Sequence, residues 1–164
     1  MSSITDTECF MELGRGFVKS AISNDFIQLR FLFDTASNGS YGKRTSFINV
    51  EYNKIGERKL EIDTFSAGEV KCENCDIIKF SVFDPKNFHK PTEICISLMD
   101  TICNDVPTWQ LTSYQTNSIR NYHLSDPVQI SGNFLPKDIL VGLNYYWKIW
   151  IVVLMILDLY QNSG

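Results

Sequence analysis

Apolar and polar residues alternate along much of the chain, and this alternation predicts short β-strands. In the segment 25–34, every second residue is apolar: Ile27, Leu29, Phe31 and Phe33. A two-residue period with one apolar face is typical of a half-buried strand. Seven or eight such runs, separated by Gly, Pro, Asn and Asp, follow one another over residues 25–161. They predict a mainly β fold, an antiparallel β-sandwich of the jelly-roll kind.

The first 22 residues follow a different pattern. A Thr-x-x-Glu capping box at residues 5–8 precedes apolar residues at helical spacing, namely Phe10, Leu13, Phe17 and Ala21. This pattern predicts one N-terminal α-helix, or a docking arm, over residues 5–22. Gly14 and Gly16 weaken such a helix by about 1 kcal/mol each relative to Ala. Because the chain shows no repeat or linker, residues 1–164 are predicted to form a single domain.

The longest apolar run lies near the C-terminus, where residues 149–157 carry no polar side chain. A transmembrane helix needs about 20 apolar residues, so no transmembrane segment is expected. With a period of two, the run predicts a long central strand with one face in the core. Its second face would be covered by the N-terminal helix or by another subunit, and a membrane-active segment is the third alternative. The candidate interface residues on this second face are Trp150, Val152, Leu154 and Ile156.

The charge pattern bears on partners and compartment. The net charge is −4, and the tightest basic group, between Lys43 and Lys59, is interleaved with Glu51, Glu57 and Glu61. Nucleic-acid binding needs a basic surface without such neutralisation, so none is expected. The N-terminus lacks the pattern of a secretory signal, and the five cysteines are irregularly spaced. A reducing compartment, the cytoplasm, is therefore predicted.

Candidate chemistry is sparse. Cys72 and Cys75 have metal-ligand spacing, but the downstream cysteines and His89 do not complete a usual set of four zinc ligands, so they are weak candidates only. His89 and His123 lack a neighbouring nucleophile motif. No metal, cofactor or catalytic residue is predicted. The aromatic side chains of Trp109, Tyr114 and Tyr122 are candidates for stacking against a sugar or small ligand.

These observations favour a non-enzymatic β-sandwich that binds a protein partner or itself, such as a viral or host-interacting factor. Two alternatives stay open. One is a β-sandwich that binds a carbohydrate or small ligand, and the other is a small hydrolase that uses a loop histidine. The apolar C-terminal run makes self-association the first property to test.

Overall fold

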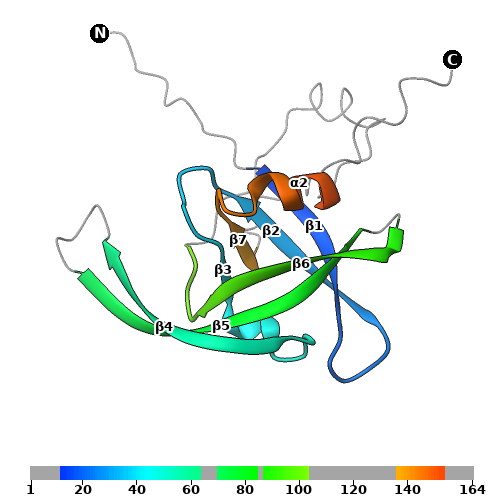
Figure 1. Ribbon diagram of the computed structural model, residues 1–164, viewed down its shortest axis with the longest axis horizontal. Helices are drawn as coiled ribbons and strands as arrows, with labels where there is room; N and C mark the ends of the chain where they lie inside the picture. Colours follow the sequence, from blue (N-terminus) through cyan, green and yellow to red (C-terminus); the bar gives the residue numbers. More distant parts are fainter. Residues whose placement is uncertain (1–11, 64–69, 85–86, 104–135, 154–164) are drawn as a thin grey trace, which may run out of the picture.

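The computed structural model describes residues 12–63, 70–84, 87–103 and 136–153. Within these ranges the chain forms seven strands, a short 3₁₀-helix and one α-helix (Figure 1). In chain order they are β1 (Glu12–Lys19), β2 (Phe26–Phe33), β3 (Tyr41–Lys43), η1 (Arg44–Phe47), β4 (Asn53–Asp63), β5 (Val70–Asp84), β6 (Asn87–Met99), β7 (Ile139–Val141) and α2 (Tyr146–Val153).

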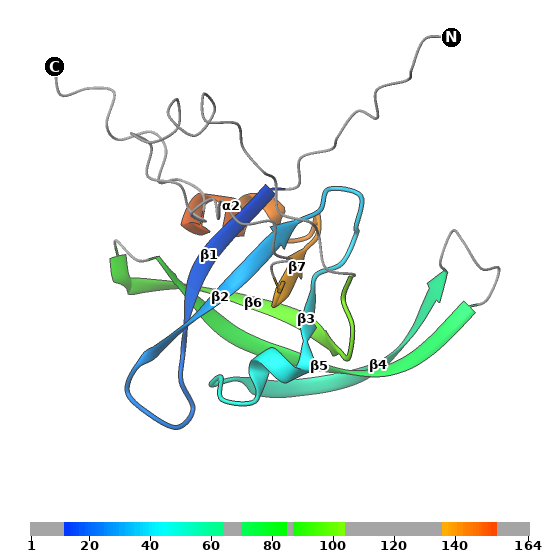
Figure 2. The ribbon, with the colours of Figure 1, turned by 180° about the vertical axis from the view of Figure 1, so that it is seen from behind.

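Six of the strands close into a barrel in the order β1-β2-β7-β3-β6-β5, because β5 also pairs with β1. The closing register joins Phe17 to Phe83 and Val18 to Val82. Two pairings, β2–β7 and β3–β6, are parallel. The predicted antiparallel sandwich or jelly roll is therefore wrong, since a sandwich has two facing sheets whereas this sheet curls round until its ends meet (Figures 1 and 2). The prediction of a mainly β chain is confirmed.

The barrel interior is filled by the apolar positions that alternation picks out. Leu29, Phe31 and Phe33 of β2 are buried, as the two-residue period predicts. They pack in one cluster with alternate residues of β5 and β6, including Ile78 and Ile96. Burial of these side chains is the main source of stability for a domain of this size.

The region predicted as an N-terminal helix forms strand β1 over residues 12–19. Residues 5–11 lie outside the described part of the chain. The helical prediction is wrong. The inward-facing positions of β1 carry glycine, so the sequence lacks the large apolar residues by which a strand is recognised. A Cβ atom on Gly16 would lie 2.7 Å from the Phe31 ring and 3.2 Å from Val82. Glycine lets β1 approach the core closely, and it also removes the apolar alternation from the sequence.

The C-terminal run begins as helix α2 rather than as the predicted central strand. The helix lies across one end of the barrel (Figure 1), with Tyr146 and Ile149 buried in the core cluster. The backbone N–H of Cys95 donates to the Tyr145 hydroxyl at 3.1 Å, which ties the start of the helix to β6. Trp150 and Val152 are half-buried and pack against the core. The buried residues of this run are therefore spaced three to four positions apart, as on one face of a helix, and do not alternate as the predicted strand required.

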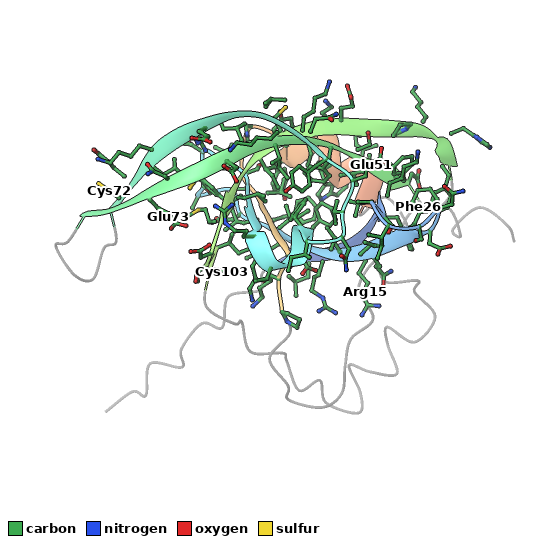
Figure 3. The ribbon with its side chains drawn as sticks, turned by 90° about the horizontal axis from the view of Figure 1, so that it is seen from below. Arg15, Phe26, Glu51, Cys72, Glu73 and Cys103 are labelled. Atoms are coloured by element: carbon green, nitrogen blue, oxygen red, sulfur yellow. The ribbon has the colours of Figure 1, made fainter. Side chains whose placement is uncertain are left out.

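Strand β4 lies outside the barrel and pairs with β5 along ten residue positions, with a bulge at Ile55. Strand β6 pairs with β5 only from Asp76 onward. Residues 58–63 of β4 and 70–75 of β5 therefore form a two-stranded ribbon, here called the arm. It extends beyond the barrel in Figures 1 and 2, and Cys72 marks its outer part in Figure 3.

Candidate functional site

An open groove forms where β5 changes partner along one edge. On this edge β5 pairs with β4 as far as Lys79, opposite Asn53, and pairs with β1 at Val82 and Phe83. Phe80 and Ser81 lie between the two pairings. The groove beside this junction of β1 and β4 has a volume of about 420 Å³. We call it the fork groove.

The start of β4 is held at the fork by hydrogen bonds to the end of β1. Ser20 and Val50 form an antiparallel bridge, and the Glu51 N–H donates to the Lys19 carbonyl at 2.9 Å. When the two registers are continued along β5, both Lys19 and Glu51 lie level with Ser81. Backbone hydrogen bonds therefore join the end of β1 to the start of β4 beside the groove.

Aromatic side chains line much of the fork groove. Phe26, Phe83 and Phe88 form a cluster, in which the Phe26 ring lies 4.7 Å from Phe88 and 4.9 Å from Phe83, centroid to centroid. Tyr52 lies on the β4 side and Pro91 on β6. Phe26, Phe88 and Tyr52 are 38%, 37% and 40% exposed. Each ring thus leaves an apolar surface open to solvent, and an aromatic surface of this kind is enriched at protein interfaces.

Charged side chains of both signs stand at the edge of the groove. Lys79 and Glu93 form an ion pair at 3.0 Å across β5 and β6. The hydrogen bond to Glu93 raises the pKa of Lys79 above its usual value, so this lysine stays charged. Lys19 and Glu51 supply one further charge of each sign. The lining therefore has two cationic and two anionic side chains, and a polyanion gains no net attraction there. Figure 3 shows Glu51 and Phe26 at the end of the molecule remote from Cys72.

The described lining of the groove carries no serine–histidine or cysteine–histidine pair. Its lining contains Ser81 but no histidine or cysteine among the described residues. A serine nucleophile needs a general base within hydrogen-bonding reach. His89 lies exposed on β6 and is not among the groove residues, and His123 lies outside the described residues. The described part of the chain also has no cluster of three or more His, Cys, Asp or Glu side chains arranged to hold a metal ion.

Cys72 and Cys75 lie three residues apart on one strand, β5. Because side chains alternate between the two faces of a strand, this spacing sends the two thiols to opposite faces. Cys72 is exposed and Cys75 is buried. Burial raises the pKa of the Cys75 thiol, which disfavours the thiolate that metal binding requires. The two residues are therefore not brought together as a ligand pair.

The other candidate residues fall mostly beyond the described structure. Trp109, Tyr114 and Tyr122 lie in the segment 104–135, and Leu154 and Ile156 in the segment 154–164, both outside the described residues. Their proposed binding and interface roles stay predictions. Trp150 and Val152 face the barrel and pack partly against its core.

Sequence reasoning missed the residues of the fork groove. Phe26 begins a strand on its outward-facing side, a position where alternation predicts a polar residue, and Phe88 lies among polar residues before Pro91. Large apolar residues at polar positions are the signal that could have marked them. Nothing in the spacing of the chain, however, indicates that β4 and β1 share one edge of β5.

No known protein family, curated protein or solved structure matches the chain. Within the described residues, no helix is both long and apolar enough to cross a membrane. The function therefore has to be inferred from the groove and from the exposed surfaces themselves.

Proposed function

We propose that this protein is a non-enzymatic protein-binding module whose fork groove holds an extended segment of a partner chain. The observation that carries the proposal is the presence of three half-exposed aromatic side chains, Phe26, Phe88 and Tyr52, around one groove. Aromatic residues on a rigid scaffold supply much of the binding energy at protein interfaces. Phe26 and Phe88 stand on the barrel strands β2 and β6, which provide such a scaffold, and Tyr52 directly precedes β4.

Three features of the groove fit a peptide better than other ligands. Its charges balance, which does not favour a nucleic acid. Its aromatic lining, together with Pro91, offers surfaces against which apolar or proline side chains pack. It runs beside Lys79, Phe80 and Ser81 of β5, a stretch of strand along which an extended segment can lie. An extended segment can use all three features together.

A selection of displayed peptides against the wild-type protein tests the proposal. The affinity of a selected peptide is then measured by fluorescence anisotropy for wild type, Tyr52→Ala and Phe88→Ser. We expect each groove variant to weaken binding by at least about tenfold, as for a central aromatic at an interface. Ile48→Ala is the matched control, because Ile48 is 74% exposed and does not line the groove. Its affinity should equal that of wild type.

Two results would contradict the proposal. The first is a selected peptide whose affinity is the same for wild type and for both groove variants. The second is binding on a glycan array that Tyr52→Ala abolishes, while no peptide is enriched, which would make the groove a carbohydrate site. Phe88 also contacts Phe17, with 5.8 Å between the ring centroids, so Phe88→Ser removes a contact within the barrel wall. Circular dichroism of each variant therefore checks that the barrel is folded.

A further inference from the structure

Two of the four charged side chains that line the fork groove already satisfy each other. Lys79 and Glu93 form an ion pair with 3.0 Å between the charged atoms. Lys19 and Glu51 are joined through their backbones and are both exposed, and no ion pair links their side chains in the described structure. These two side chains are therefore the charged groups of the groove that remain for a ligand.

The aromatic lining gives a bound cation an advantage over a bound anion. Five of the residues that line the groove are aromatic, and Phe26, Tyr52 and Phe88 are each more than one-third exposed. The face of an aromatic ring carries partial negative charge, so it attracts an ammonium or a guanidinium group. Because the charges of the lining sum to zero, the rings decide which sign of charge the groove favours.

The lysines of the groove do not occupy these ring faces. Two cations lie over tyrosine rings in the described structure, Arg58 and Lys148, and both are outside the groove. Among the described residues, neither Lys19 nor Lys79 lies over a ring in this way, and Lys79 is held by Glu93. The exposed ring faces of the groove therefore remain for a cation that a ligand supplies.

We propose that the partner segment in the fork groove carries an arginine, whose guanidinium stacks on an exposed ring and pairs with Glu51. This inference rests on the proposed binding of a peptide in the groove, and it names the residue by which that peptide is recognised. Tyr52 follows Glu51 directly, and Phe26 lies at the same end of the molecule as Glu51 (Figure 3). A planar guanidinium can stack on a ring while its edge binds a carboxylate, whereas the ammonium of lysine is a hydrated point charge.

Peptides selected by display against the wild-type protein give the first test. We expect arginine to be enriched among them. Replacing that arginine by citrulline, which keeps the shape but removes the charge, should weaken binding at least about tenfold. Lysine in its place should weaken binding less than citrulline does, because lysine keeps the charge. Fluorescence anisotropy measures the dissociation constants.

The protein side of the contact is tested with Glu51→Gln, which removes the carboxylate charge and keeps the size of the side chain. This variant should weaken binding of the arginine peptide about three- to tenfold, and should leave binding of the citrulline peptide unchanged. Glu61→Gln is the matched control, since Glu61 is exposed on β4 and does not line the groove. Its affinity for the arginine peptide should equal that of wild type.

A small probe makes the test independent of any selected peptide. N-acetyl-arginine amide, titrated into isotope-labelled wild-type protein, should shift the backbone amide resonances of Tyr52 and Ser81. N-acetyl-citrulline amide should bind at least about tenfold more weakly. An arginine amide that causes no shift would overturn the inference, as would a shift that Glu51→Gln leaves unchanged.

The outcomes separate this inference from the proposed function. Peptides that lose affinity in Tyr52→Ala and Phe88→Ser, yet bind equally well with citrulline, would overturn the arginine and leave peptide binding in the groove standing. Acidic peptides whose binding depends on Lys19 would overturn it in favour of an anionic ligand. Peptides unaffected by both groove variants would overturn the proposed function, and the arginine with it.

Discussion

The barrel and the arm share strand β5 but are stabilised differently. In the barrel, Ile78, Phe80 and Val82 of β5 are buried at alternate positions, and β5 has strands on both sides. In the arm, β5 pairs only with β4 among the described strands, and Cys72 and Asn74 are exposed. An isolated pair of strands is marginally stable in water. The folding free energy of this protein is therefore concentrated in the barrel.

The largest effect should come from removing a core side chain of β5. Ile78 is fully buried in the barrel cluster. We expect Ile78→Ala to lower the free energy of unfolding by about 2–5 kcal/mol, through lost burial and the cavity that remains. Denaturant titration followed by circular dichroism measures the change.

The control for this prediction is the same substitution near the base of the arm. Ile55 occupies the β4 bulge and is 54% exposed. Ile55→Ala should change the free energy of unfolding by no more than about 0.5 kcal/mol. If Ile78→Ala and Ile55→Ala lowered the free energy of unfolding equally, the folding free energy would not be concentrated in the barrel.

A smaller effect is expected where the arm joins the barrel. Asp76 accepts hydrogen bonds from Lys54 Nζ at 2.9 Å and from Arg44 Nη1 at 2.8 Å, and Arg44 also bonds Asp100. These bonds, Lys54 first and then Arg44, hold the pKa of Asp76 below its usual value. Because the side chains are about one-third exposed, Asp76→Asn should lower the free energy of unfolding by about 1 kcal/mol or less.

The pH dependence of this loss follows from the direction of the pKa shift. A lowered carboxyl pKa stabilises the folded state above the unfolded pKa of Asp, about 3.9. This stabilisation is lost as pH falls through the lower pKa of the folded protein. The difference between wild type and Asp76→Asn should thus be full at neutral pH and shrink below about pH 4. A difference of the same size at every pH would contradict an ionic origin. Glu93 pairs with Lys79 in a more exposed position, so Glu93→Gln should lower the free energy of unfolding by less than Asp76→Asn does.

The sequence predicts the strands whose inward positions carry large apolar residues. Strand β2 is such a case, since the interior positions Leu29, Phe31 and Phe33 stand in plain alternation. Strand β1 is not, because Gly14 and Gly16 occupy interior positions and leave no apolar signal. Strand β7 is only three residues long, and its place between β2 and β3 depends on pairings more than 90 positions apart in the chain. Barrel closure could therefore not be inferred from local patterns.

The C-terminal helix was missed for a related reason. A helix that is apolar on both sides lacks the polar stripe by which amphipathic helices are recognised. Its inner side is apolar because Ile149 fills the barrel end, and its outer side because of Trp147 and Ile151. The fork groove depends on where β5 exchanges one neighbour for another, which is a property of register that composition and spacing do not encode.

The smallest effect should appear in the arm itself. Leu60 pairs with Glu73 and is half-buried, with no place in the barrel cluster. Leu60→Ser should change the free energy of unfolding by less than about 0.5 kcal/mol. Hydrogen exchange is the more sensitive measurement, because a weakly stabilised ribbon opens without global unfolding. Amides of residues 58–63 should exchange faster in Leu60→Ser than in wild type, while those of residues 94–98 in β6 stay unchanged. Equal acceleration in both segments would show that the arm and the barrel open as one unit.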